Sequence, residues 1–181
     1  MTPSEVRQAP IREFMTCVDQ QRIPPLGDYL QDYVKSDCAA DSAEYRLVPL
    51  AAPSLRFVQT SSMCLTDCML ELQSKYEHFI PDGWGGRMEK GWRDLGAIGF
   101  DIQEGLTLEI REINQTLCHE QWAEPRLACL DWQRLLVHGV VDFGRSCGAT
   151  QVTCDAAYSD VAKRSGFEYV ESSGCFVLEL Q

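Results

Sequence analysis

One group of residues in the sequence has side chains that could in principle bind zinc. Cys64 and Cys68 are four residues apart, so on a helix they share one face, and Cys118-His119 offers two further zinc ligands. No second Cys-x-x-Cys or His-x-x-x-His pair accompanies them, and two partly buried thiols are the ordinary alternative. We therefore expect no metal. His119 also titrates in the range that suits a general base, although a loop histidine without a role is the simpler interpretation.

Other signatures of catalysis are absent or unspecific. Nine cysteines allow a Cys/His/Asp nucleophilic arrangement, but no local motif marks one of them. The phosphate-loop and dinucleotide fingerprints do not occur. The glycines between Gly83 and Gly91 surround Trp84 without the strand, turn and helix order of a phosphate cradle, which predicts a loop or a loosely paired strand.

Any site must be positioned by helices and strands, and the first pattern along the chain is helical. It covers residues 3–37, and Pro24-Pro25 interrupts it. This pattern predicts a helical N-terminal extension over residues 1–42, followed by one domain over residues 43–181.

The first half of that domain shows both strand and helix patterns. Residues 44–50 predict a strand, which Pro49 restricts to an edge or a strand end. From Ser62 the apolar residues Met63, Leu70, Leu72, Tyr76 and Phe79 predict a helix, closed by the turn Pro81-Asp82-Gly83.

The next two segments predict an antiparallel pair. Residues 95–102 are apolar and β-prone, and Glu104-Gly105 provides a turn into residues 106–117. Leu106, Leu108 and Ile110 alternate as one buried face, but the next apolar residue, Ile113, is out of phase by one. A one-residue slip in a period-2 pattern indicates a β-bulge, here near Arg111-Glu112.

The last third of the chain has the clearest patterns. Residues 124–147 predict a long helix, because Trp132, Leu135, Leu136, Val140 and Phe143 form one apolar stripe and Gly148 provides a stop. A strand at residues 150–154, a helix at residues 155–165 and a hairpin over residues 167–180 follow.

This order is α+β, with a mixed, mostly antiparallel central sheet flanked by helices, and it resembles the Gcn5-related N-acetyltransferase (GNAT) fold. The motifs Gly148-Ala149 with Val152, Gly166-Phe167 and Leu178-Glu179-Leu180 stand where GNAT proteins have similar residues. The good match covers residues 124–180, and a weaker one reaches back to Tyr45.

The resemblance implies a site at the bulge. In GNAT proteins, acetyl-CoA or another acyl-CoA lies where two parallel strands splay apart, which makes Ile113 and Asn114 candidate cofactor contacts. The general base is often a glutamate on the bulged strand. Glu112 is our preferred candidate and Glu109 the second. The alternative for Glu112 is an outward-facing carboxylate paired with Arg111.

The cofactor loop departs from the family pattern. The family motif R/Q-x-x-G-x-G/A, whose amides cradle the pyrophosphate, corresponds here to residues 126–132. Arg126 is retained, but Cys129 and Asp131 replace the glycines. Their side chains crowd the phosphates, and the carboxylate repels them by about 1 kcal/mol or more. Leu130 and Trp132 complete this degenerate cofactor-binding set.

The helix over residues 155–165 also differs from the family. Ala162 stands where the family has a tyrosine that protonates the leaving thiolate, and Tyr158, one turn earlier, is the substitute candidate. A tyrosine of the core or rim is the alternative. Asp155 replaces a frequent asparagine and joins the candidate cofactor contacts, with an N-cap as its simpler role.

Composition limits the partners. The chain has 181 residues, a net charge of −11 and no apolar run that would span a bilayer, so we expect neither nucleic acid nor a membrane as partner. An acidic surface favours a cationic small-molecule or peptide amine. An odd number of scattered cysteines suits the cytoplasm. A homodimer is among the assemblies that we consider.

Two functions therefore remain open. The first is an N-acyltransferase that moves an acyl group from acyl-CoA to an amine. The second is a GNAT-shaped binding or assembly module, such as those of phages, that has lost this chemistry.

Overall fold

The computed structural model describes residues 30–35, 44–51, 66–81, 83–115 and 127–181, together with positions 13, 16, 17 and 20. The predicted extension over residues 1–42 lies mostly outside this part of the chain, and Cys64, Cys118, His119 and Arg126 lie wholly outside it. None of the described helices is long and apolar enough to span a membrane.

In the described part of the chain, seven strands form one mixed sheet in the order β1-β2-β3-β4-β5-β7-β6. Within the described residues, β4 and β5 are the one parallel pair, and the other neighbours are antiparallel. The α+β class and the mixed, mostly antiparallel sheet are thus confirmed. The strands are β1 Tyr45–Ala51, β2 Cys68–Ile80, β3 Arg87–Gln103, β4 Thr107–Gln115, β5 Gln151–Asp155, β6 Glu168–Val170 and β7 Cys175–Glu179.

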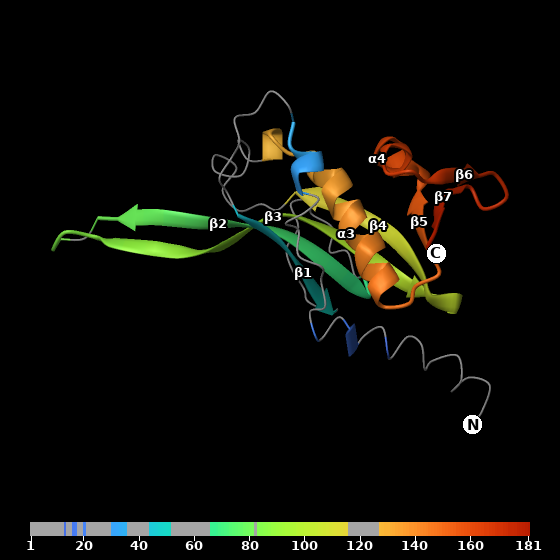
Figure 1. Ribbon diagram of the computed structural model, residues 1–181, viewed down its shortest axis with the longest axis horizontal. Coiled ribbons are helices and arrows are strands. Elements are labelled where there is room, and N and C mark those ends of the chain that lie inside the picture. The colour runs from blue at the N-terminus through green and yellow to red at the C-terminus, as the bar shows by residue number, and fades with distance from the viewer. Residues whose placement is uncertain are drawn as a thin grey trace.

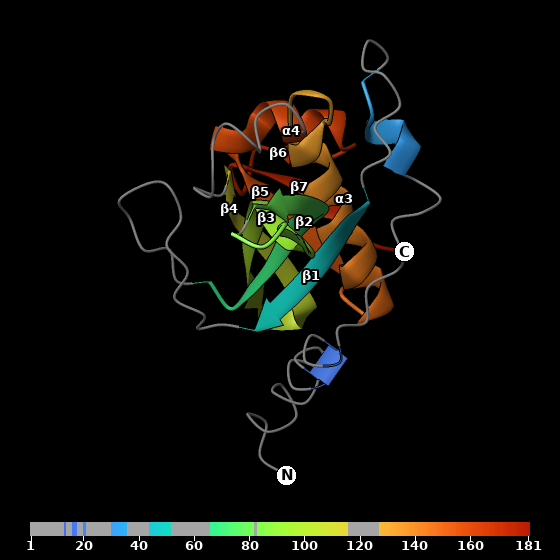
Figure 2. The same cartoon turned by 90° about the vertical axis from the view of Figure 1, so that its left-hand side faces the viewer.

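Among the described elements, two α-helices and three short 3-10 helices accompany the sheet. The long helix α3 connects the two parallel strands, as a crossover between parallel neighbours requires. Figure 1 shows α3 lying along one face of strands β2 to β4, and Figure 2 shows the same arrangement from the side. The helical elements are η2 Leu30–Tyr33, η3 Glu104–Leu106, α3 Trp132–Ser146, η4 Ala156–Tyr158 and α4 Ser159–Arg164.

The core lies between α3 and the sheet. The predicted stripe of α3 is buried at Leu135, Leu136, Val140 and Phe143, and the Phe143 ring packs 6.5 Å from the Phe100 ring of β3. The helix ends as predicted at Gly148, whose positive φ of 81° lets the Ala149 N–H donate to the Gly144 carbonyl.

The helix predicted from Ser62 is wrong, since the described part of it, Cys68–Ile80, is strand β2. The first five residues of β2 are all buried, so both faces of this part of the strand are covered. Four of these five residues are apolar and do not alternate with polar ones, and periodicity alone does not separate such a strand from a helix. Phe79, assigned to the apolar side of that helix, is half exposed.

The start of the long helix is also corrected, from residue 124 to Trp132. Leu127 and Ala128 are helical, but Leu130 then forms an antiparallel bridge with Val34, and Asp131 has a non-helical backbone with ψ of 64°. A long-range pairing therefore interrupts the predicted helix before α3 begins. The predicted edge strand containing Pro49, the short strand β5 and the final β6–β7 hairpin are confirmed.

Candidate active site at the β4 bulge

The predicted bulge is present on β4. Gly99 of β3 pairs with Glu112, whereas the next residue, Phe100, pairs with Ile110, so Arg111 is the extra residue. Ile110 and Ile113 are both buried, and they pair with Phe100 and Ile98, two buried residues of one face of β3. The bulge therefore restores the phase of the buried face, and it leaves Arg111 and Glu112 opposite a single glycine.

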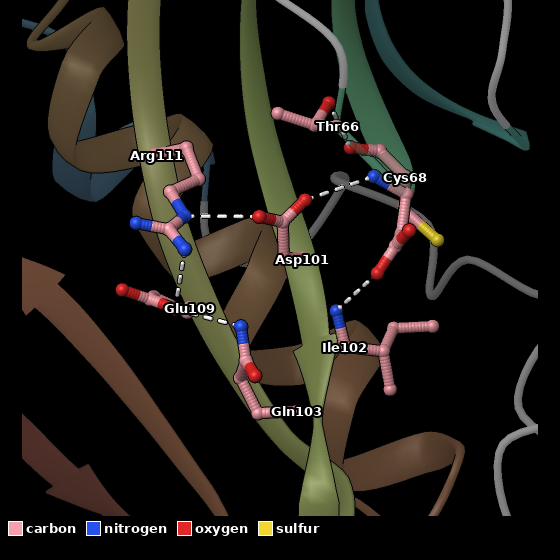
Figure 3. A network of polar contacts seen from close by, with 8 residues as sticks. Thr66, Cys68, Asp101, Ile102, Gln103, Glu109 and Arg111 are labelled. Carbon is pink, nitrogen blue, oxygen red and sulfur yellow. Dashed lines mark hydrogen bonds and ion pairs between the residues drawn. The ribbon is translucent and has the colours of Figure 1, made fainter.

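Ion pairs hold Arg111 on the outer face of the sheet (Figure 3). Its Nε lies 2.9 Å from Asp101 Oδ2, and its second terminal nitrogen lies 3.0 Å from Glu109 Oε2. The hydrogen bond to Asp101 raises the pKa of Arg111 above its usual value. Gln103 also donates to Glu109, at 2.8 Å. Glu109 thus accepts from two donors, Arg111 and Gln103. The pairing with Arg111 that was the alternative for Glu112 is therefore made by Glu109.

Glu112 has a different environment. Its side chain is only 7% exposed, Oε2 accepts a hydrogen bond of 2.7 Å from Asn114 Nδ2, and Oε1 is buried without a hydrogen-bond partner among the described residues. A Cβ at Gly99 would lie 2.9 Å from Glu112 Cγ, so the glycine makes room for this carboxylate. An unsatisfied buried acceptor costs about 1–3 kcal/mol. Such an acceptor is an exception that needs an explanation, and a catalytic role and a bound water are two of the explanations.

The parallel strands separate next to Glu112. β4 pairs with β5 only from Thr107 to Ile110, and β4 then continues to Gln115 after β5 has ended at Asp155. The candidate contacts Ile113 and Asn114 lie in this unpaired length of β4. The Tyr158 hydroxyl accepts a hydrogen bond of 3.4 Å from the Ile113 N–H, which brings two predicted site residues together across the gap. Asp155 caps η4 by accepting from the Ala157 N–H at 2.7 Å.

A bulged strand, a single parallel pair that separates beyond the bulge, a crossover helix and a closing hairpin occur in the order that the sequence resemblance implies. The fold is GNAT-like. No protein-family model and no curated protein matches the chain.

Solved structures are similar to it, and two of them are acetyltransferases. A GNAT family N-acetyltransferase (YhbS) from Escherichia coli in complex with CoA aligns with 14% identity and a TM-score of 0.41, covering 64% of this chain. The alignment spans 60% of the E. coli protein. Nourseothricin acetyltransferase aligns with 13% identity and a TM-score of 0.35, covering 78% of this chain and 100% of its own. The GNAT-like assignment therefore rests on the topology of the sheet and the bulge.

The loop before α3 of the GNAT-like domain is bound by the segment 30–35. The Asp131 N–H donates to the Tyr33 carbonyl and the Lys35 N–H donates to the Cys129 carbonyl, both at 2.9 Å. The Leu130 N–H donates to the Leu127 carbonyl at 3.2 Å. The amides of Leu130 and Asp131 are thus already used and do not form the anion cradle expected of this loop. Cys129 is disulfide-bonded, whereas Cys17, Cys68, Cys147, Cys154 and Cys175 are thiols outside any disulfide.

A pocket remains at the first turn of α3. Its lining residues are Lys35, Leu127, Leu130, Asp131, Trp132, Gln133 and Arg164. The N–H groups of Trp132 and Gln133 have no acceptor among the described residues, as is usual for a first helical turn. Arg164 forms an ion pair with Asp131 and offsets the negative charge that the sequence places here. Lys35 and Arg164 were missed from the sequence because both come from segments distant from the loop.

A chain of side-chain hydrogen bonds connects the segment 30–35 to α3. The Tyr33 hydroxyl bonds His138 Nδ1, and His138 Nε2 lies 3.1 Å from Asp142 Oδ2. Burial raises the pKa of Tyr33, and the Arg134 guanidinium over its ring, at 5.1 Å, partly opposes that shift. The spacing of His138 and Asp142 by four residues on a predicted helix was the available signal for this network. In the described part of the chain, no cluster of His, Cys, Asp and Glu could hold a metal ion.

Cys154 of β5 forms the last pair with β4. Its thiol leads to a prediction about stability at high pH. Burial, with the Asp155 charge beside it, raises the pKa of the Cys154 thiol from its usual 9.0 to about 12. Between these values the unfolded chain has lost the thiol proton while the folded chain retains it, so the free energy of unfolding falls as the pH rises. We expect Cys154→Ala to show a shallower loss of stability between about pH 9 and pH 12 in urea unfolding. Equal slopes for the two proteins would contradict the assignment.

Proposed function

We propose that the GNAT-like domain transfers an acyl group from acyl-CoA to an amine, and that Glu112 accepts the proton of the amine directly or through a water molecule. The observation that carries this proposal is the buried Glu112 carboxylate, with one unsatisfied oxygen, beside the bulge where β4 leaves β5. A positioned carboxylate of this kind contributes about 10²–10⁴-fold to a proton transfer.

The residues around Glu112 suit the same reaction. Acyl-CoA supplies the thioester carbonyl that the amine attacks. Asn114 orients the Glu112 carboxylate through Oε2, which leaves Oε1 to accept a proton. The unpaired length of β4 beyond the bulge, with Ile113 and Asn114, offers backbone groups to the acyl carrier. Tyr158, hydrogen-bonded at Ile113, is the proposed proton donor to the departing thiolate.

Two places could hold the phosphates of acyl-CoA, the loop 127–131 and the first turn of α3, and only the second fits them. The loop 127–131 does not fit a pyrophosphate, since it has no glycine and its amides at Leu130 and Asp131 bond within the protein. The first turn of α3 does fit an anion, because the unbonded N–H groups of Trp132 and Gln133 lie in a pocket with Lys35 and Arg164. We therefore place the phosphates on α3, Lys35 and Arg164 rather than on the loop.

The amine is expected to be cationic. The net charge of −11 attracts a polyamine or a basic peptide and disfavours nucleic acid. A protonated amine also requires the base that Glu112 would provide.

One observation favours the second function, a binding or assembly module without acyl-CoA chemistry. The segment 30–35 bonds to the backbone of the loop that GNAT proteins use for the pyrophosphate, and Cys129 of that loop is disulfide-bonded. In that case the bulge site is a remnant, and neither Lys35 nor Arg164 contacts a cofactor.

A thermal-shift experiment with acetyl-CoA and longer acyl-CoAs separates the two functions. At about 100 times Kd, binding adds ~2.7 kcal/mol to stability, which raises Tm by several degrees. We expect this shift in the wild type and its loss in Arg164→Ala. Arg145→Ala is the matched control, because Arg145 is equally exposed (48% against 49%) and also pairs with an aspartate. If none of the acyl-CoAs shifts Tm, the enzyme proposal fails and the module stands.

A further inference from the structure

A second pocket lies along the middle of α3. Its described lining comes from Tyr33 of η2, from one face of α3 between Arg134 and Arg145, from Ser165 at the end of α4 and from Leu178 of β7. We call it the Arg134 pocket. Its volume is about 210 Å³, and none of its described lining residues also lines the pocket at the first turn of α3. The acyl-transfer proposal therefore leaves this pocket unused.

Arg134 presents unused hydrogen-bond donors at this pocket. Its guanidinium lies over the Tyr33 ring, 5.1 Å from the ring centre. Stacking on a ring leaves the N–H groups available, because they lie in the plane of the guanidinium. Among the described residues, no side chain accepts a hydrogen bond from these groups and no carboxylate pairs with the charge. A planar fork of this kind matches the two oxygens of a carboxylate.

Most other polar side chains around the pocket bond to one another. His138 bonds the Tyr33 hydroxyl through Nδ1, and its Nε2 lies 3.1 Å from Asp142 Oδ2. Arg145 pairs with the same aspartate at 3.5 Å. Ser165 differs, since its buried hydroxyl oxygen has no hydrogen-bond partner among the described residues. A buried polar atom without a partner is exceptional, so Ser165 adds a second unused donor to the lining.

The rest of the lining is apolar and holds no acid. The apolar side chains are those of Val137, Val141 and Leu178, and no Asp or Glu is among the described lining residues. Three aspartates act on Tyr33 through their charges without lining the pocket, namely Asp32, Asp131 and Asp142, and the last two are paired with arginines. The net charge of −11 repels anions at long range, so binding of an anion here depends on short contacts.

We propose that the Arg134 pocket binds a small carboxylate with an apolar body. The carboxylate accepts two hydrogen bonds from the Arg134 guanidinium, and the apolar body packs on Val137, Val141 and Leu178. The ligand is small, because sites for drug-sized molecules have volumes of about 300–1,000 Å³. This site does not depend on the proposed acyl transfer.

Calorimetric titration of the full chain without acyl-CoA tests the ligand class. We expect benzoate or butyrate to bind saturably with a Kd of about 1 mM or tighter. Benzamide has the shape of benzoate without its charge, and inorganic phosphate has charge without an apolar body, so we expect each to bind at least about tenfold more weakly than benzoate. The proposal is overturned if neither carboxylate saturates by about 10 mM, or if benzamide or phosphate binds as tightly as benzoate.

Variants of Arg134 test the contact. We expect Arg134→Gln to weaken benzoate binding at least about tenfold and to leave benzamide binding unchanged. Arg134→Lys retains the charge but loses the fork, so it should show most of the same loss. Arg164→Gln is the matched control, because Arg164 is a partly exposed arginine that lines the pocket at the first turn of α3 instead, and it should bind benzoate normally. Unchanged binding in Arg134→Gln, or an equal loss in the control, would overturn the proposal.

Amide chemical shifts of the wild type locate the ligand even where a variant does not fold, which circular dichroism would show. Benzoate should shift amides of residues 30–35 and 134–145 and those of Ser165 and Leu178. Shifts confined to β4 beyond the bulge would place benzoate in the proposed acyl site and overturn the inference. Because acyl-CoA is absent from these experiments, failure of the acyl-transfer proposal would leave their outcome unchanged.

Discussion

Replacing Glu112 with Gln is expected to lower the rate of acyl transfer to an amine by about 10²–10⁴-fold, while Tm remains close to that of the wild type. The amide keeps the shape of the side chain above Gly99, but it does not accept a proton from the substrate. Formation of acetylated polyamine from acetyl-CoA, followed by mass spectrometry, measures the effect. The loss should appear in kcat, because the base acts on the bound amine.

The matched control for this prediction is Glu109→Gln. Glu109 lies on the same strand, but it is paired with Arg111 and accepts from Gln103, so its removal costs only exposed contacts. We expect Glu109→Gln to retain most of the activity. Equal losses in the two variants would show that Glu112 has no special role in proton transfer.

The bulge could be inferred from the sequence because its signal is local. Ile110 and Ile113 are three residues apart, whereas two positions on the same face of a regular strand are separated by an even number of residues. The structure resolves this conflict with one extra residue, Arg111. Likewise, the stripe of α3 and the glycines that end it are local patterns, and they predicted the helix and its C-terminus.

The errors share a different cause, which is pairing between distant segments. β2 resembled a helix because β1 and β3 flank it and both of its faces are buried at Cys68–Leu72. The start of α3 was placed too early because Val34 and Leu130, which are remote in sequence, form a bridge. Periodicity describes the faces of one segment and contains no information about such partners.

In the candidate site too, local features could be predicted from the sequence and contacts between distant segments could not. Glu112 was a candidate because of the family resemblance and its place beside the predicted bulge, but the room for its side chain comes from Gly99 of β3, where a Cβ would lie 2.9 Å from Glu112 Cγ. Lys35 and Arg164, which would hold an anion at α3, come from the segment 30–35 and from α4. Their proximity follows from the topology of the sheet and could not be obtained from spacing.

The bulge predicts that two single-residue deletions in β4 have very different effects on stability. Deleting Glu109 moves Ile110, which is fully buried against Phe100, to the outer face and turns Arg111 into the core beneath α3. The lost burial costs about 1.5–3 kcal/mol, and an unpaired buried guanidinium costs several more. We expect a loss of at least ~4 kcal/mol in urea unfolding, which is much of the stability of a typical domain.

Deleting Arg111 should destabilise the fold far less, because it removes the extra residue and leaves Ile110 and Ile113 on the buried face. We expect a stability change of no more than about 1 kcal/mol, from the loss of exposed ion pairs to Asp101 and Glu109. Activity should nevertheless fall about 10²-fold, since the loss of the bulge moves Glu112 relative to the substrate. If both deletions destabilise the fold equally, Arg111 is not the extra residue. If the Arg111 deletion remains active, the bulge does not position the site.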